Sequence, residues 1–366
     1  METSKTLIEV KNVCQEFHLT KGLLQSLRFE KGKLVKEDKV VHAVNDVSFE
    51  IKKGEVFSLV GESGCGKSTT ARTVIRLLEP TSGQVLYKGK DISHLGPNEL
   101  LPYRKSMQMI FQDPYASLNP RQRVADIIME PLLFHGIAKT KEEARERCMS
   151  ILARVGLRPE QAGRYPHQFS GGQRQRIGIA RALAVNPEFI IADEPVSALD
   201  VSIQAQILNL LKSLQKELHL TLLFVGHGLG AVNYVSDRIA VMYLGKIVEI
   251  GEAKEIFRHP VHPYTQALIE AVPVPDPEEK DRRKEFLAGE IGDSANPPMG
   301  CRFHPRCPHA TPECAKQVPE LLELAGCPGH LVACPVMAET KPQKTGAAKA
   351  AAAGALTDQK GGRKDV

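Results

Sequence analysis

The segment with the clearest chemical potential is Gly-Glu-Ser-Gly-Cys-Gly-Lys-Ser-Thr at residues 61–69, which follows the apolar run 56–60. Glycines at this spacing let the backbone fold around a phosphate, so that successive N–H groups and the start of the next helix point at anionic oxygens. Lys67 adds a mobile positive charge, and the Ser68 hydroxyl suits a magnesium ion bridging nucleotide phosphates. The sequence therefore predicts a nucleotide-phosphate loop, whose members are Gly61, Ser63, Gly64, Cys65, Gly66, Lys67, Ser68 and Thr69.

Two further segments carry groups that act on phosphates. The apolar run Ile190–Ala192 ends in Asp193 and Glu194. The first carboxylate can hold magnesium through its water shell, and the second can polarise an attacking water. Upstream, a glycine-rich start of a helix offers a second anion site. Taken singly, the two acids could merely cap a strand, but the joint order of the segments favours chemistry. The residues of the helix start are Ser170, Gly171, Gly172 and Gln173.

Ser-Gly-Gly-Gln, placed before a strand that ends in Asp-Glu, resembles the signature of ABC ATPases. The resemblance implies that Gln112 senses the metal and the attacking water, and that His227 contacts the γ-phosphate. It also implies that Phe17 stacks on adenine, and that residues 197–200 cross to the opposite protomer. On its own, Gln112 could be a surface turn residue and His227 a local hydrogen-bonding group. The family usually has Asp after the histidine, whereas this chain has Gly228; we expect activity to survive.

The same resemblance implies a nucleotide shared between two cassettes. ATP and Mg²⁺ bind to the phosphate loop of one protomer, and the signature helix of another protomer completes the site. Hydrolysis is assigned to Glu194, His227 and Gln112, and magnesium to Ser68, Gln112 and Asp193. Phosphoryl transfer depends mainly on positioning and electrostatics, which fits a set without a covalent nucleophile. A lone chain should therefore be a poor ATPase.

Composition limits what else the chain can be. It has 366 residues, of which 42% are apolar, enough for about two globular domains with a real core. No stretch approaches the ~18–20 uninterrupted apolar residues of a membrane span, and the N-terminus has no signal pattern. If the chain powers transport, we expect the pore to be another polypeptide. Only one phosphate loop and one signature occur, so the second cassette must also come from another chain.

The charge is unevenly distributed. The net charge is +5, and residues 18–40 and 338–366 each carry six Lys or Arg against three Asp or Glu. Such segments suit an anionic membrane surface or acidic loops of a partner, or are simply solvated. The rest of the chain is nearly neutral, and we expect no nucleic-acid partner.

The pattern of elements predicts an α/β fold. We expect strands at 7–13 and 43–60, a helix at 67–79, and a helical region at about 115–180. The ABC resemblance implies a P-loop nucleotide-binding domain with a RecA-like core, an antiparallel β subdomain and a helical signature subdomain, plus a small Cys-rich C-terminal extension. The expected boundaries are 1–258 for the nucleotide-binding domain, with a basic insertion at about 18–40, 259–337 for the extension, and 338–366 for a disordered tail.

The C-terminal segment is rich in cysteine, with five of the chain's eight cysteines between residues 301 and 334. In reducing surroundings such clustering favours metal ligation over disulfides. Residues 262–268 and 300–308 resemble the C-terminal extension of oligopeptide and dipeptide importer ATPases. In that family the cysteines resemble a [4Fe–4S] site, with Cys301, Cys307, Cys314 and Cys334 as ligands. Cys327 could replace Cys334, and zinc bound by Cys alone or with His304, His309 or His330 is the alternative.

These features predict the ATP-hydrolysing subunit of a membrane importer for di- and oligopeptides, peripheral on the cytoplasmic face of the membrane. The implied partners are two transmembrane permease subunits, a second ABC ATPase as a heterodimer, and an extracytoplasmic substrate-binding protein. Nickel chelates, sugars or opines are alternative cargoes. A soluble ABC ATPase of DNA repair or translation, and a metal-site module with vestigial nucleotide binding, are the other hypotheses. Co-purification with two multispanning membrane proteins would discriminate among them.

Overall fold

The computed structural model describes residues 5–19, 27–30, 33–36, 39–271 and 292–338. These residues fall into two compact units. The first unit draws on residues 1–15, 44–59 and 67–236, and the second on 16–43, 60–66 and 237–366. Much of the predicted basic insertion, and the predicted disordered tail beyond residue 338, lie outside the described residues.

A parallel sheet forms the core of the first unit. Its strand order is β5 (Val56–Val60), β10 (Thr221–Val225), β9 (Phe189–Asp193) and β8 (Met107–Ile110). Every residue of β5, β9 and β10 is buried, as expected for parallel strands that are covered on both faces. The register pairs Val225 with Asp193, so the carboxyl ends of these strands meet at one edge of the sheet.

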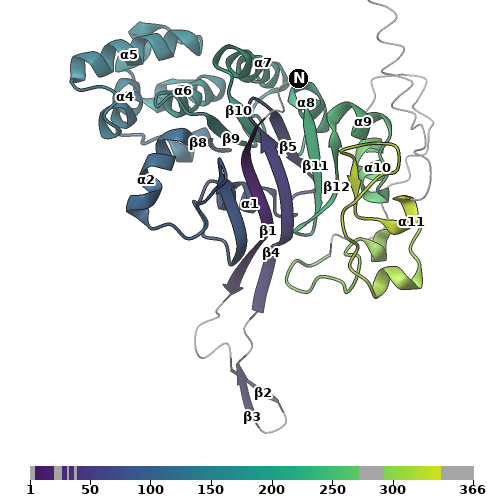
Figure 1. Cartoon of the computed structure of the whole chain (residues 1–366). Helices are drawn as coiled ribbons and strands as arrows, with labels where there is room; N and C mark the ends of the chain where they lie inside the picture. The colour runs from purple at the N-terminus through teal and green to yellow at the C-terminus, as the bar shows by residue number, and fades with distance from the viewer. Residues whose placement is uncertain (1–4, 20–26, 31–32, 37–38, 272–291, 339–366) are drawn as a thin grey trace, which may run out of the picture. The chain divides into compact units, whose positions relative to one another are not determined.

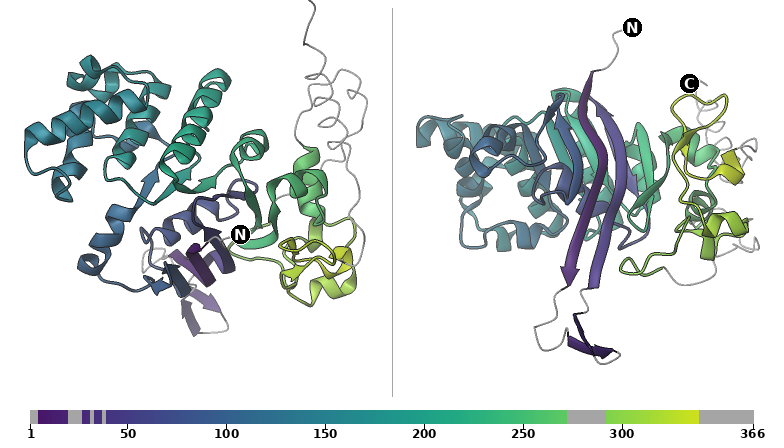
Figure 2. Two further views of the ribbon diagram at one scale, coloured as in Figure 1. Left: turned by 45° about the horizontal axis from the view of Figure 1, so that its top comes forward. Right: turned by 60° about the horizontal axis from the view of Figure 1, so that its bottom comes forward.

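A second sheet of the first unit is antiparallel, in the order β4 (Lys39–Lys52), β1 (Thr6–Leu19), β6 (Ser82–Tyr87) and β7 (Lys90–Asp91). Figures 1 and 2 show β1 and β4 as long neighbouring strands. The region 43–60, predicted to form strands, contains the end of β4 and the whole of β5, which a turn with Gly54 at φ +78° separates.

Helices α4, α5 and α6 lie together in Figure 1. The helix after the phosphate loop is shorter than the predicted 67–79, because Arg76 adopts the left-handed conformation at φ +58°, which α-helices do not continue through. The helices are α1 (Lys67–Val74), α2 (Pro97–Ser106), α3 (Pro114–Ser117), α4 (Val124–Phe134), α5 (Lys141–Arg154), α6 (Gly171–Leu183), α7 (Val201–Leu218) and α8 (Leu229–Val235), with 3₁₀ turns η1 (Pro159–Gly163) and η2 (Pro166–Gln168).

The second unit is built around the antiparallel hairpin β11 (Arg238–Tyr243) and β12 (Lys246–Glu252). Leu244 and Gly245 turn the hairpin with φ values of +43° and +77°, the conformation of a tight two-residue turn. Strand β14 pairs with β12, and β13 pairs with β14. Strands β2 and β3, which come early in the sequence, form a separate hairpin. The remaining elements are α9 (Ala253–Arg258), α10 (Pro263–Glu270), η4 (His304–Arg306), η5 (Pro312–Ala315), β13 (Leu322–Glu323), β14 (Leu331–Val332), α11 (Pro335–Ala338), β2 (Leu27–Glu30) and β3 (Lys33–Lys36).

None of the helices in the described part of the chain is both long enough and apolar enough to cross a membrane.

Candidate functional site

The phosphate loop adopts a backbone that only glycine permits at two of its positions. Gly61 and Gly66 have φ values of +149° and +104°. A Cβ on Gly61 would lie 2.2 Å from the carbonyl oxygen of Met242, and one on Gly66 would lie 2.3 Å from that of Ala43. Cys65 is 3% exposed and its carbonyl oxygen accepts a 2.8 Å hydrogen bond from the N–H of Gly245, so it packs within the second unit.

Ser68, on the first turn of α1, reaches the end of β9. Its hydroxyl donates a 2.7 Å hydrogen bond to Oδ1 of Asp193. The Asp193 carboxylate is fully buried, and burial raises its pKa although the Ser68 bond acts in the opposite direction. Among the described residues its Oδ2 atom has no hydrogen-bond partner, and Arg72 Nη2 lies 3.7 Å away. A buried carboxylate oxygen without a donor beside a serine hydroxyl fits a magnesium ion, which prefers oxygen ligands.

Three predicted residues converge just beyond the ends of three parallel strands. Glu194 Oε2 accepts a 2.9 Å hydrogen bond from Gln112 Nε2, and His227 Nδ1 lies 3.3 Å from the same oxygen. Glu194 has φ +45° and its N–H donates to the carbonyl oxygen of Val225 at 2.9 Å. This bond fixes where the carboxylate leaves the sheet, and the side chain is 15% exposed.

Ser197 supports this group; it was predicted only as part of the segment 197–200 that crosses to the opposite protomer, and not as a neighbour of Glu194. Its hydroxyl donates to the Glu194 carbonyl oxygen at 3.1 Å and accepts from Gln112 Nε2 at 3.4 Å. Arg72, the cation beside Asp193, was also missed. Its place one helical turn after Ser68 puts both on the same face of α1, and this spacing could have indicated it.

The predicted signature residues form the start of α6. Ser170 caps the helix: its hydroxyl accepts from the N–H of Gln173 at 3.4 Å, and Gln173 Oε1 accepts from the N–H of Ser170 at 3.0 Å. This reciprocal pair is a capping box. Gly172 packs against α7, since a Cβ there would lie 2.4 Å from Cγ2 of Ile203. A Cβ on Gly171 would lie 3.2 Å from Cδ2 of Leu199.

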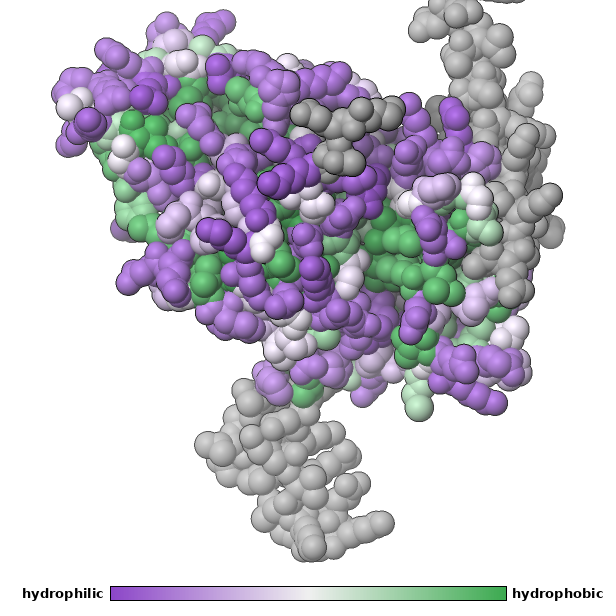
Figure 3. Space-filling model, in the orientation of Figure 1, coloured by the Kyte–Doolittle hydropathy of each residue, from purple (hydrophilic) through white to green (hydrophobic). Residues whose placement is uncertain are grey.

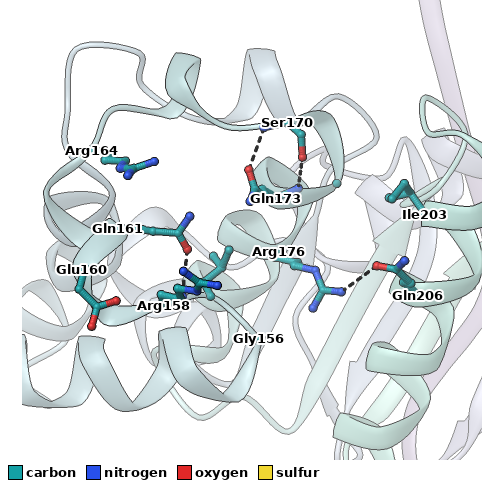
Figure 4. Close-up of a pocket in the computed structure, with 12 residues that line it drawn as sticks. Gly156, Arg158, Glu160, Gln161, Arg164, Ser170, Gln173, Arg176, Ile203 and Gln206 are labelled. Atoms are coloured by element: carbon teal, nitrogen blue, oxygen red, sulfur yellow. Dashed lines mark hydrogen bonds between the residues drawn. The ribbon is translucent and has the colours of Figure 1, made fainter.

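A cavity of about 810 Å³ opens beside the signature residues, as Figure 4 shows. Three arginines line it together with Ser170, Gly172 and Gln173. Arg176 donates to the carbonyl oxygen of Val155 at 2.6 Å. The lining residues are Gly156, Leu157, Arg158, Glu160, Gln161, Arg164, Ser170, Gly172, Gln173, Arg176, Ile203 and Gln206. The balance of charge is positive, so the cavity favours an anionic occupant.

Phe17, predicted to stack on adenine, lies in β1 with 37% of its surface exposed. Its assignment stays a prediction. Gly228, which replaces the family's usual Asp, is the residue directly before α8 and has φ −78°, so it needs no glycine-specific conformation.

The prediction of a metal site among the C-terminal cysteines is wrong. In the ranges that the structure describes, no group of three or more His, Cys, Asp or Glu side chains could hold a metal ion. Neither the [4Fe–4S] cluster nor the zinc alternative is therefore supported. The four cysteines predicted as ligands are Cys301, Cys307, Cys314 and Cys334. The predicted replacements are Cys327, His304, His309 and His330.

The thiols instead take part in packing and local hydrogen bonding. Cys327 and Cys334 contact an apolar cluster that contains Val332. The Cys314 sulfur accepts from the N–H of Thr311 at 3.5 Å. Burial raises the pKa of Cys334 to about 11, and the nearby thiols of Cys301, Cys307 and Cys314 act in the same direction. Clustering in sequence reflected packing of a small segment.

The chain is similar to known proteins of ABC transporters. A model of the ABC transporter family matches residues 44–197, and a model of the oligopeptide/dipeptide transporter C-terminal region matches residues 248–314. The oligopeptide transport ATP-binding protein AppF of Bacillus subtilis is 53% identical over 332 residues, which cover 90% of this chain and 97% of that protein.

Solved structures of ATP-binding cassettes are also similar to this chain. The dimeric ATP-binding cassette MJ0796 in a post-hydrolysis state, bound to ADP and Pi, is 30% identical with a TM-score of 0.58, over 68% of this chain and 99% of that one. The protein cbiO1 of Clostridium perfringens, part of the ABC transporter complex cbiONQ, is 27% identical with a TM-score of 0.57, over 69% and 91%.

The fold and the residues at the strand ends thus define a P-loop ATPase of the ABC class, for which ATP and Mg²⁺ are the implied ligands. More particularly, the chain belongs to the family of oligopeptide transport ATP-binding proteins of ABC transporters. This confirms the resemblance that the signature and the C-terminal motifs indicated.

Proposed function

We propose that this chain is the ATP-hydrolysing subunit of an ABC importer that powers the uptake of di- or oligopeptides. The observation that carries the proposal is the convergence of Gln112 and His227 on the Glu194 carboxylate, beside the buried Asp193–Ser68 pair. The names of its relatives supply the transport context and the peptide cargo. Nickel chelates, sugars and opines are the alternative cargoes.

In this proposal the phosphate loop, residues 61–69, binds the triphosphate through its N–H groups and Lys67. Ser68, Asp193 and Gln112 hold the magnesium ion, which would neutralise charge on the β- and γ-phosphates when bound. The unsatisfied Oδ2 of Asp193 supports this role. Phe17 would stack on the adenine ring.

Glu194 is the proposed group that orients and activates the attacking water. Its carboxylate is an acceptor held in place by Gln112, while His227 Nδ1 lies within reach of the same oxygen. His227 would contact the γ-phosphate, so loss of that phosphate would alter the whole group.

The signature residues would complete the nucleotide site of a second cassette. The N-terminus of α6 carries the positive end of the helix dipole. Ser170 and Gly172 line the cavity of Figure 4, which is wide enough for phosphates and carries Arg158, Arg164 and Arg176. A second, related ATPase chain in a heterodimer is the proposed source of the nucleotide.

A groove of about 560 Å³ in the first unit is the proposed docking place for a permease subunit. It runs along α4, where Phe134 is 70% exposed, and includes Ile127, Pro131 and Arg181. Figure 3 shows small apolar areas among hydrophilic side chains on one face of the molecule. Two such permeases, an extracytoplasmic binding protein and a place on the cytoplasmic membrane face complete the proposal.

The C-terminal part belongs to the proposed architecture as well. We place a nucleotide-binding domain at 1–258, with its RecA-like core and a helical signature subdomain at about 115–180, and an extension at 259–337. The match of residues 248–314 to the transporter C-terminal region supports a C-terminal extension in this part of the chain. Cys327 and Cys334 of this extension pack against an apolar cluster.

Glu194→Gln tests the proposal. The amide keeps the size of the carboxylate and its oxygen can still accept from Gln112, but it cannot take up a proton, so the chain assembled with its partner cassette should bind ATP with unchanged affinity while phosphate release falls at least about 100-fold. ATP should also hold the variant as a closed dimer. Glu142→Gln, on the exposed first turn of α5, is the matched control. Unchanged turnover in Glu194→Gln would remove Glu194 from its role. Purification without any membrane-spanning subunit would favour a non-transport ATPase.

A further inference from the structure

Glu62, the second residue of the phosphate loop, is tied to the C-terminal part of the chain. Its N–H donates a 2.9 Å hydrogen bond to the hydroxyl oxygen of Tyr264. Its carboxylate accepts two bonds from Arg306, at 3.0 Å from Nη1 and 3.4 Å from Nη2. Tyr264 lies on α10 and Arg306 on η4, and the three residues belong to the same unit. Backbone and side chain of one loop residue are therefore held by two separate elements.

Closely packed aromatic side chains hold Tyr264 and Arg306 in place. Tyr264 is fully buried, and its ring centroid lies 4.7 Å from that of Tyr243 and 5.5 Å from that of Phe303. Arg306 also donates to the hydroxyl of Tyr243 at 3.4 Å. Close-packed aromatic rings leave these side chains few alternative rotamers. Movement of Glu62 would require repacking of this cluster.

The ion pair is well shielded from water. The side chain of Arg306 is 7% exposed and that of Glu62 is 24% exposed. Burial alone would lower the pKa of Arg306, but its hydrogen bonds to Glu62 and Tyr243 outweigh burial and raise it. Such a bidentate arginine–carboxylate pair holds both position and charge more firmly than an exposed pair does.

A carboxylate in a loop that binds a polyphosphate presents an electrostatic problem. Unpaired, Glu62 would repel the phosphates that the neighbouring N–H groups attract, and the repulsion would grow with the number of phosphate charges. Arg306 cancels that charge. At the same time, the bond from the Glu62 N–H to Tyr264 leaves that amide directed away from the ligand and fixes the start of the loop.

We propose that Arg306 and Tyr264 are positioning residues of the nucleotide site, which act through Glu62 to neutralise and hold the phosphate loop. The C-terminal segment is then a working part of nucleotide binding. This inference rests on the proposed function, since it requires that the loop at residues 61–69 binds the phosphates.

The test is calorimetric titration of the purified full chain with ATP, ADP and AMP at about 0.05 M salt and at about 0.5 M salt, a change that shortens the Debye length about threefold. Arg306→Gln should weaken ATP binding about tenfold at low salt, ADP less and AMP least, and added salt should shrink the loss. The double variant Glu62→Gln, Arg306→Gln should recover most of the ATP affinity, because it removes the uncompensated charge. Tyr264→Phe should weaken ATP binding about three- to tenfold.

Lys316→Gln is the matched control, since it removes one positive charge from an exposed position of the same segment; it should bind ATP as the natural chain does. An equal loss for ATP, ADP and AMP in Arg306→Gln, not rescued by Glu62→Gln, would overturn the inference and mark Arg306 as a residue of the fold alone. Lys67→Ala separates the two proposals. If it abolishes ATP binding while Arg306→Gln has no effect, only the role of Arg306 is lost; if it has no effect, the nucleotide site itself is refuted.

Discussion

Acid should lower the stability of the second unit, because the unit contains His262, a buried histidine that must stay neutral. It is 1% exposed, and its Nδ1 accepts a 3.1 Å hydrogen bond from the N–H of Tyr264, which caps α10. The backbone N–H of His262 donates to Oε2 of Glu249 at 3.0 Å. Protonation would turn the Nδ1 acceptor into a donor that faces another donor, so the cap would be lost.

The magnitude follows from the pKa of His262, which burial lowers to about 4 although the Glu249 charge acts in the opposite direction. In the unfolded chain a histidine has a pKa of about 6.5. The folded state therefore keeps its full stability above about pH 6.5 and loses it as the pH falls toward 4. The complete loss corresponds to about 3 kcal/mol, and about 2 kcal/mol is already lost at pH 5. Glu249 and His330, which form a 2.7 Å pair, are the other titratable groups at this position.

Hydrogen exchange followed by mass spectrometry on peptides that cover α10 measures this loss locally. His262→Asn is the matched control, because its amide oxygen can cap α10 and does not titrate between pH 5 and 7.5. After correction for intrinsic exchange, the natural chain should lose about 2 kcal/mol of protection between pH 7.5 and 5 relative to His262→Asn. Identical pH dependence in the two proteins would refute a neutral, capping His262.

Two further substitutions test the packing of the signature helix and the correction at the cysteines. Gly172→Ala should lower the free energy of unfolding by about 1–3 kcal/mol and ATP turnover at least about tenfold, because its Cβ would lie 2.4 Å from Ile203. Thermal unfolding measures the first effect and phosphate release the second. Gly163→Ala, where a Cβ meets nothing within 4 Å, is the control and should change neither. Cys334→Val should change stability by less than about 1.5 kcal/mol, because the thiol packs beside Val332. Elemental analysis should find neither iron nor zinc in stoichiometric amount before or after that change, and tightly bound metal lost with Cys334 would contradict the packing role.

What the sequence could predict is what lies close together along the chain. The phosphate loop, the capping box at Ser170 and the acids after β9 are each contained within a few residues, so spacing and residue type suffice to find them. The bond from Arg306 to Glu62 joins residues 244 positions apart, and no local pattern indicates it. The cysteine prediction failed for a different reason: clustering in sequence was taken as evidence of a metal centre, whereas the described residues contain no metal-binding group, Cys314 bonds to its own turn and Cys334 packs against an apolar cluster.

The group around Glu194 is a long-range feature that sequence reasoning nevertheless located, and the sheet explains why. Strands β8, β9 and β10 are parallel and in register, with Ile110 opposite Ala192 and Asp193 opposite Val225. Their carboxyl ends therefore meet at one edge, where ligands of open α/β sheets bind. Each of the three site residues follows its strand at once or after one residue, so a shared edge brings them together without any contact in sequence. Movement of one strand end by a single residue would reverse the direction of its side chain and break the group, which makes the register as necessary to hydrolysis as the carboxylate.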